Sequence, residues 1–244
     1  MVKVGCCGWN YLNAERYFEN WKKRFRSKLQ AYAKLFDLVE VNSTFYKIPK
    51  LETVKRWREE VDEINKNFEF TLKCNKAITH ESAFSSKAIE TFDEMKKIAK
   101  ALRASILLMQ TPASFKPTKK NIEKVRKFFS SIDREKFKIV WEVRWKKDWS
   151  KEIVKKLFRE IKVNQCVDPF RQEIFYFKDV IYYRLHGLGS GMYNYKFSDS
   201  ELKLLASKVK EKEEKKNMYV LFNNIYMYED ALAFIKLLKL LKLK

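Results

Sequence analysis

The feature of this sequence that most constrains its fold is a series of short apolar segments that each end in polar or charged residues. An apolar strand that ends in a charged group carries a desolvation cost, which partners or a ligand must offset. If these segments are parallel strands of one barrel, their ends converge on a single rim, where barrel proteins keep their active sites. The residues at the segment ends are Glu40, Asn42, Lys73, Gln110, Glu142, Arg144, Asp168, Arg184, His186, Asn223 and Asn224.

Strand and helix patterns alternate along the chain, which predicts a (β/α)8 TIM-type barrel. The predicted strands are residues 3–8, 38–42, 69–74, 105–110, 138–144, 162–168, 180–187 and 218–223. The predicted helices are residues 14–36, 51–65, 85–102, 118–132 and 150–161, a charged run at 208–217, and a last helix that begins at residue 229. Only residues 169–179 separate the sixth and seventh strands, so the helix between them is expected to be short or missing.

The chain is expected to form one domain over residues 1–244, because no linker rich in Pro, Gly or Ser divides it. The whole sequence holds only five Gly and four Pro. Helix starts are predicted at Thr118, at Ser150, and at Ser198 with Glu201, whose S-x-x-E spacing forms a capping box.

No signal peptide or membrane span is expected, so the sequence predicts a soluble, cytoplasmic protein without a membrane partner. The four cysteines lack C-x-x-C spacing and are expected to be buried free thiols. A disulfide between them is compatible only with a hyperthermophilic source. Abundant Lys, Glu and Ile fit a thermophilic source.

The charge balance favours an anionic partner. Lys and Arg number 52 against 31 Asp and Glu, which gives a formal net charge of +21. Ion-pair networks raise both signs together, so they do not account for this excess, whereas attraction to a polyanion does. Basic residues concentrate at 22–28, 116–127 and 146–156. The alternative is a generally basic surface that only aids solubility.

Residues two apart on a strand point the same way, which groups the segment-end residues into pairs. The same-facing pairs are Glu40 with Asn42, Thr71 with Lys73, Glu142 with Arg144, Cys166 with Asp168, and Arg184 with His186. If these pairs point inward, the upper barrel holds alternating charges in place of the branched apolar side chains that usually fill a barrel.

Several blocks of the sequence resemble the YecE-like family, also known as domain of unknown function seventy-two. The blocks are GCCGW, VEVNSTFYKIP, FTLKCNKAITH, QTPASFK, WEVRWKKDW, YYRLHG and YVLFNN, and they span nearly the whole chain. The resemblance implies a TIM barrel of unassigned activity. The sequence departs from the family pattern at Trp145, where relatives tend to carry His, and in the segment after Asn224.

The charged residues suggest roles in a site at the rim. Glu142 and Asp168 lie on neighbouring strands between arginines, so they are expected to stay ionised and to position a ligand. Glu40 has apolar neighbours in sequence, and it becomes a candidate general acid or base if it lacks a cation. His186 lies at a strand end and is expected to act in proton transfer. Lys73 is expected to hold an anion or, if desolvated, to form a Schiff base.

The candidate catalytic residues are thus Glu40, Lys73, Glu142, Asp168 and His186. The candidate substrate-binding residues are Asn42, Tyr46, Gln110, Arg144, Trp149, Arg184, Tyr193 and Asn223. Forked guanidinium groups suit phosphate oxygens, and aromatic rings suit stacking on a sugar or base. The segment 187–195 is expected to be a loop that contacts substrate.

No metal site and no cofactor are expected, because the carboxylates and histidines follow no metal-binding spacing and nearby cations would compete. The leading hypothesis is an enzyme, most simply a hydrolase, that acts on a phosphate-bearing small molecule or on nucleic acid. One alternative is a lyase or aldolase that uses Lys73 as a Schiff base. The others are a nucleic-acid-binding protein without catalysis, and charges that only brace the barrel. The oligomeric state stays open.

Overall fold

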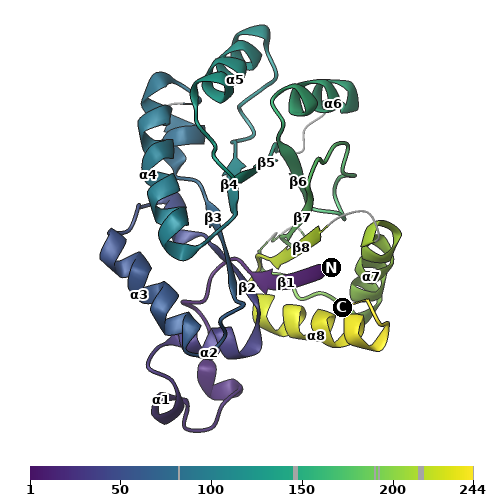
Figure 1. The fold of residues 1–244 in the computed structure, drawn as a ribbon. Helices are drawn as coiled ribbons and strands as arrows, with labels where there is room; N and C mark the ends of the chain where they lie inside the picture. Colours follow the sequence, from purple (N-terminus) through teal and green to yellow (C-terminus); the bar gives the residue numbers. More distant parts are fainter. Residues whose placement is uncertain (82, 145–147, 190, 192, 214–216, 244) are drawn as a thin grey trace.

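Eight parallel strands form a closed barrel in the order β1 to β8, which confirms the predicted (β/α)8 fold (Figure 1). The computed structural model describes residues 1–244 except 82, 145–147, 190, 192, 214–216 and 244. The strands are β1 (Val2–Cys6), β2 (Leu38–Val41), β3 (Glu69–Lys73), β4 (Ile106–Gln110), β5 (Lys138–Glu142), β6 (Asn164–Val167), β7 (Val180–Leu185) and β8 (Asn217–Phe222). Strand β1 pairs with β8 over its full length, and this pairing closes the barrel.

Helices surround the barrel, as Figure 1 shows. The helices are α1 (Trp21–Arg24), α2 (Lys28–Leu35), α3 (Leu51–Asp62), α4 (Ser86–Leu102), α5 (Lys119–Ser131), α6 (Lys151–Glu160), α7 (Asp199–Glu213) and α8 (Met227–Leu240). Short turns of helix add η1 (Ala14–Arg16), η2 (Ser43–Phe45) and the wider π turn η3 (Ala77–Glu81). Within the described residues, none of these helices is long and apolar enough to cross a bilayer.

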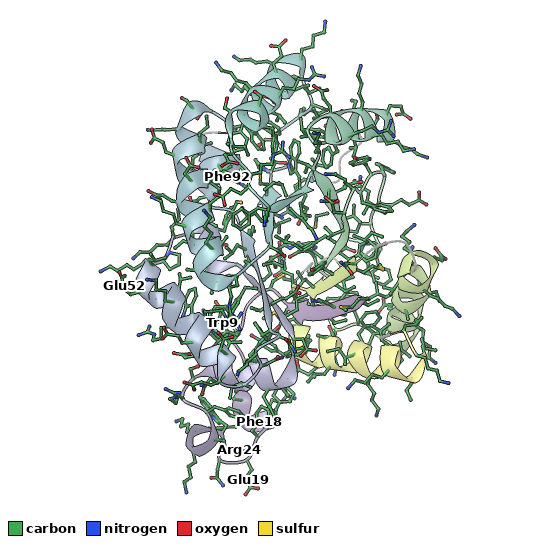
Figure 2. All side chains as sticks on the ribbon, in the orientation of Figure 1. Trp9, Phe18, Glu19, Arg24, Glu52 and Phe92 are labelled. Atoms are coloured by element: carbon green, nitrogen blue, oxygen red, sulfur yellow. The ribbon has the colours of Figure 1, made fainter. Side chains whose placement is uncertain are left out.

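The single helix predicted over residues 14–36 is wrong, because the chain breaks it into η1, α1 and α2. Asn20 has a left-handed backbone (φ 51°), which Asn tolerates and a continuing helix does not allow. Phe25 is extended, and Ser27 then caps α2 by accepting a hydrogen bond from the Gln30 amide. Helix α1 lies at one extremity of the ribbon (Figure 1), and Figure 2 places Arg24 and Glu19 there.

The segment between β6 and β7 holds no helix, as the short spacing predicted. Side-chain amides at the start of β6 hold this segment instead. The Asn164 Oδ1 accepts hydrogen bonds from the backbone N–H groups of Lys178, Asp179 and Val180. These bonds satisfy backbone donors that a helix would otherwise have paired.

The predicted helix caps are present. Thr118 accepts from the Asn121 amide and Ser150 accepts from the Ile153 amide. Ser198 and Glu201 exchange bonds as a capping box. The charged run predicted as helix at 208–217 is helical to Glu213; residues 214–216 lie outside the described structure, and Asn217 already belongs to β8.

Apolar side chains fill two regions, one between the sheet and the helices and one inside the barrel. Phe92, labelled in Figure 2, lies on α4 and is fully buried in the first region. The smaller interior group is Cys7, Leu38, Ile106, Leu108, Val140, Cys166, Val180, Tyr182, Tyr219 and Leu221. All four cysteines are buried and free, as expected.

Gly5 allows β1 to lie close to β2. A Cβ atom at this position would overlap the backbone carbonyl of Leu38. A backbone carbonyl cannot move aside as a flexible side chain can, so only glycine fits here.

Candidate functional site

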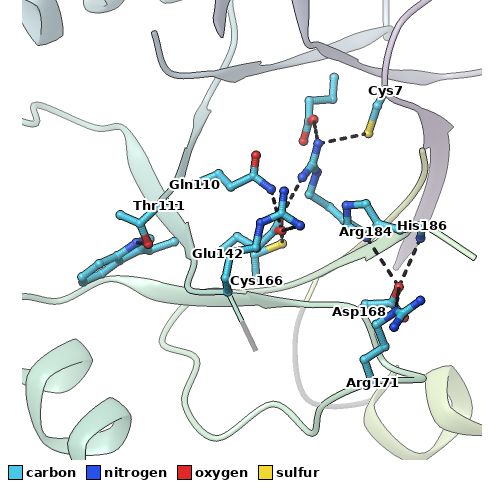
Figure 3. Close-up of polar contacts among 12 residues, drawn as sticks. Cys7, Gln110, Thr111, Glu142, Cys166, Asp168, Arg171, Arg184 and His186 are labelled. Carbon is cyan, nitrogen blue, oxygen red and sulfur yellow. Dashed lines mark hydrogen bonds and ion pairs between the residues drawn. The ribbon is translucent and has the colours of Figure 1, made fainter. Parts of the chain in front are cut away.

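The side chain of Arg184 bridges two carboxylates inside the barrel (Figure 3). Its Nη2 donates to Glu40 Oε1 at 2.8 Å, and its Nη1 donates to Glu142 Oε2 at 2.5 Å. Arg184 and Glu40 are 0% exposed, and Glu142 is 3% exposed. The three residues come from β7, β2 and β5, so the contact joins strands on different sides of the barrel.

Glu40 has a second partner in addition to the guanidinium. Tyr182 donates its hydroxyl to Glu40 Oε2 at 2.9 Å, and the same hydroxyl lies 2.8 Å from the Thr71 Oγ1. The sequence made Glu40 a general acid or base only if it lacked a cation, and Arg184 is that cation. Both carboxylate oxygens of Glu40 are therefore engaged in structural contacts.

Glu142 is held ionised. Gln110 donates to Glu142 Oε1 at 2.7 Å, and the Arg144 guanidinium lies 4.0 Å from the same oxygen. Burial raises the pKa of Glu142, but the positive charges of Arg184, His186 and Arg144 outweigh burial and lower the pKa to about 2. A carboxylate of this kind positions its neighbours and does not donate a proton.

The buried layer formed by Glu40, Glu142 and Arg184 changes the interpretation of Arg184. The sequence suggested that its guanidinium holds a substrate anion, but the group is buried and already shared between two carboxylates. An anion at this depth would meet Glu40 and Glu142 first. Arg184 therefore neutralises the charged layer, and the groups that can meet a substrate lie above it.

Lys73 is the last residue of β3, and the charge of Arg184 acts on it. No carboxylate lies within salt-bridge distance of its ammonium group among the described residues, and Nζ lies 4.1 Å from the centre of the Phe45 ring. Burial and then the charge of Arg184 lower its pKa from 10.5 to about 8. Lys73 is thus an under-compensated cation.

His80 is a rim residue that the sequence did not place among the catalytic candidates. It lies on η3, only partly exposed to solvent, with its ring edge-on to Phe45 at 5.0 Å between centres. Its Nδ1 bonds with the Thr79 hydroxyl at 2.8 Å. Burial, Lys73 and Arg144 together lower the pKa of His80, so its ring is neutral at neutral pH. The strand pattern of β3 did not predict this position, because the π turn η3, and not the strand itself, places His80 at the rim.

Asp168 and His186 form a second group at the rim (Figure 3). Asp168 Oδ2 accepts from the His186 backbone N–H at 3.1 Å and lies 3.5 Å from the His186 Nδ1. Arg171 approaches the same oxygen at 3.8 Å and donates to the Gly187 carbonyl. Tyr193 packs edge-on against the His186 ring, with 5.7 Å between centres. This arrangement fixes the orientation of the imidazole.

The remaining predicted residues lie in different surroundings. Tyr46 is 72% exposed beside Phe45, at the rim. Trp149 is not a stacking surface for a ligand, because it is buried against Phe115 and Trp141 and donates its indole N–H to the Phe115 carbonyl. The Trp149 ring, which the sequence assigned to substrate binding, instead packs among apolar side chains between the sheet and the helices.

Asn42, Tyr193 and Asn223 do lie together, on the wall of a cavity of about 440 Å³ at the mouth. In the predicted contact loop 187–195, residues 190 and 192 lie outside the described structure, as does Trp145. The described residues contain no cluster of three or more His, Cys, Asp or Glu side chains arranged to hold a metal ion.

A closed parallel barrel with an internal arginine–carboxylate layer and a polar rim defines a TIM-type barrel protein with a candidate active site at the carboxyl ends of its strands. Residues 3–244 match the family model described as Protein of unknown function DUF72, and the chain belongs to that family.

Known relatives agree with this assignment. The UPF0759 protein YecE of Escherichia coli K12 is 30% identical over 120 residues, which are 48% of this chain and 40% of the length of that relative. A DUF72 family protein from Thermotoga maritima MSB8 is 27% identical, covers 98% of this chain and 99% of its own, and superposes with a TM-score of 0.73. A DUF72 family protein from Enterococcus faecalis V583 shares the fold at 22% identity, with a TM-score of 0.75 and coverage of 100% and 96%.

Proposed function

We propose that this protein is a barrel enzyme that binds a phosphate-bearing substrate at its rim and hydrolyses it. The observation that carries the proposal is Lys73, a cation at the mouth with no carboxylate within salt-bridge distance in the described structure. A desolvated cation without a counter-ion is costly in the free protein. An anionic ligand removes that cost when it binds.

The electrostatics of the rim support the same ligand. Lys73 and Arg144 both act to lower the pKa of His80, which indicates a local excess of positive charge. The two buried glutamates below the rim are already neutralised in part by Arg184. A phosphate group would lie between Lys73 and Arg144. The ammonium group of Lys73 and the guanidinium group of Arg144 would donate hydrogen bonds to its oxygens.

The groups around this position can catalyse hydrolysis. In the proposed reaction, water attacks the phosphorus, the bond to the leaving oxygen breaks, and a proton passes to that oxygen. Neutral His80 takes the proton from the attacking water as general base. His186, oriented by Asp168, donates the proton to the leaving oxygen. Asp168 serves here as the orienting group, and Glu40 and Glu142 hold the layer beneath.

Calorimetric titration with inorganic phosphate tests the anion site. Phosphate is expected to bind the wild-type protein with uptake of protons at pH 8, because the anion raises the pKa of Lys73 from about 8. Lys73→Gln is expected to weaken binding at least about tenfold and to abolish the proton uptake. Lys55→Gln, on the exposed face of α3, is the matched control. Binding that is equal in the wild type and in Lys73→Gln contradicts the proposed site.

Hydrolysis of a chromogenic phosphate diester tests the catalytic roles. His80→Gln is expected to lower kcat by about a hundredfold or more while phosphate affinity stays within about twofold, because general-base catalysis contributes on that scale. His186→Gln is expected to act most strongly on substrates with a poor leaving group, since protonation matters less when the leaving oxygen is acidic. Unchanged kcat in both variants contradicts these roles.

A second candidate function is Schiff-base chemistry at Lys73. The specific observation is the same buried amine, whose pKa near 8 leaves a substantial neutral fraction close to neutral pH. The amine would add to a carbonyl carbon and release water to give an imine. Borohydride reduction in the presence of dihydroxyacetone phosphate would then leave a stable adduct on Lys73, detectable by mass spectrometry. No adduct at this residue excludes this candidate for that substrate.

The formal net charge of +21 extends the proposal to nucleic acid as the phosphate-bearing substrate. Binding of single-stranded DNA is then expected to weaken steeply with salt. If the protein binds nucleic acid without catalysis, His186→Ala leaves the affinity unchanged and the wild type shows no hydrolysis. Loss of hydrolysis in His186→Ala with retained binding supports the enzyme.

A further inference from the structure

A cavity of about 440 Å³ adjoins the candidate site on the side of β1, β2 and β8. Its walls are Cys7, Tyr11, Asn42, Tyr193, Asn223, Asn224, Ile225 and Met227. Two of these residues connect it to the charged groups. The Cys7 Sγ lies 3.8 Å from the Arg184 Nη2, and Tyr193 packs against His186. The cavity therefore borders both the buried arginine–carboxylate layer and the His186 group at the rim.

Among the described residues, the walls combine apolar surface with amide groups and include no charged side chain. Tyr11, Tyr193 and Ile225 are 88%, 43% and 64% exposed, which is unusual for large apolar side chains grouped at one place. Exposed aromatic and aliphatic surface at the edge of a cavity gains free energy when a flat apolar ring covers it.

The amides differ in how they are held. Asn224 is buried and donates its Nδ2 to the Tyr195 carbonyl and to Asp230, so its orientation is fixed by the fold. The side chains of Asn42 and Asn223 make no such bonds within the described structure. The Oδ1 atoms of Asn42 and Asn224 are buried and lack hydrogen-bond partners there.

Unpaired buried acceptors destabilise a protein unless a donor reaches them. The Asn42 side chain does not cap η2, and neither Asn42 nor Asn223 has a side-chain hydrogen bond within the part of the chain that the structure describes. Amides of this kind suit the edge of a heterocycle, since one amide presents a donor and an acceptor side by side.

We infer that this cavity is a nucleobase subsite, so that the substrate of the neighbouring phosphate site is a nucleotide unit. This inference rests on the proposed function and specifies its substrate class. The phosphate lies at Lys73 and Arg144, and the base lies against Tyr193 and Ile225 with its edge toward Asn42 and Asn223. A sugar ring fits less well, because its many hydroxyl groups need more polar partners than an uncharged, largely apolar wall supplies.

Calorimetric titration with three probes tests the inference: inorganic phosphate, ribose 5-phosphate and adenosine 5′-monophosphate. The nucleotide is expected to bind at least about tenfold more tightly than ribose 5-phosphate, because stacking and edge contacts add to the phosphate contacts. In the double variant Tyr193→Ala and Asn223→Ala, the ratio of the affinity for the nucleotide to the affinity for ribose 5-phosphate is expected to fall to within about twofold of one. Its affinity for inorganic phosphate is expected to stay within about twofold of the wild-type value.

Leu204→Ala, an exposed residue on α7, is the control variant and is expected to keep the full ratio. Thermal unfolding of each variant identifies any loss of folding. A single Asn42→Ala variant repeats the test at another wall residue, so the inference stays testable if the double variant unfolds.

The outcomes separate the two proposals. Equal binding of ribose 5-phosphate and the nucleotide, with phosphate bound, overturns the nucleobase subsite and leaves the phosphate site standing. A ratio that persists in both variant proteins also overturns the subsite. If none of the three probes binds, both proposals are wrong.

Discussion

Replacement of Lys73 by Met is expected to raise the free energy of unfolding at neutral pH. The protein holds Lys73 in surroundings that lower its pKa from 10.5 to about 8, chiefly through burial. A fall of this size corresponds to about 3 kcal/mol of destabilisation of the charged form, at about 1.4 kcal/mol for each tenfold change. Loss of the contact between the ammonium group and the Phe45 ring offsets about 1 kcal/mol. The expected net gain is about 2 kcal/mol.

The pH dependence gives this prediction a distinct signature. Between about pH 8 and pH 10.5 the unfolded chain binds more protons at Lys73 than the folded chain does, so wild-type stability rises with pH in that window. Lys73→Met lacks this contribution. Its advantage over the wild type is therefore largest below about pH 8 and shrinks toward pH 10.5.

Urea unfolding at pH 7 and pH 10 measures the effect, and Lys55→Met on α3 controls for the general loss of a lysine. A Lys73→Met protein that is less stable than the wild type at pH 7 would refute the electrostatic account of the rim.

Further predictions concern the buried layer of Glu40, Glu142 and Arg184 and the contact between β1 and β2. Glu142→Gln is expected to cost about 3 kcal/mol in urea unfolding at pH 7, because it leaves the buried Arg184 under-compensated. The low pKa of Glu142 also implies that wild-type stability falls as pH drops from about 4.5 through about 2, and that Glu142→Gln loses less over this range. Gly5→Ala is expected to lower the melting temperature by several degrees, since its Cβ overlaps the Leu38 carbonyl. Gly189→Ala is expected to change it little, because its Cβ makes only ordinary van der Waals contact with the Tyr195 ring.

The inward-facing residues could be predicted from the sequence because strand geometry has a period of two. Once Leu38 and Tyr182 face the barrel interior, Glu40 and Arg184 must do so as well. The partners of Arg184 could not be predicted in this way. Its contact with Glu40 depends on barrel closure, which brings together strands that are not neighbours in the sheet.

Two other outcomes depended on three-dimensional packing. Trp149 looks like a binding residue in sequence because it follows a charged strand end, yet the hydrophobic effect draws the ring into the aromatic cluster around Trp141. The helix break at Asn20 was not predicted from the sequence, because the surrounding residues favour helix. The structure reveals it through the left-handed backbone conformation of Asn20. Boundaries at Thr118 and Ser150 were predictable because a single side-chain oxygen sets each of them.

The bridge from Glu40 to Arg184 spans 144 residues of sequence. During synthesis on a ribosome, a nascent chain that ends before β7 contains both glutamates but not the guanidinium that neutralises them. Packing those carboxylates into an apolar interior is unfavourable until the arginine emerges. Barrel closure is therefore a late event, and the first six strands on their own make a poor folding unit.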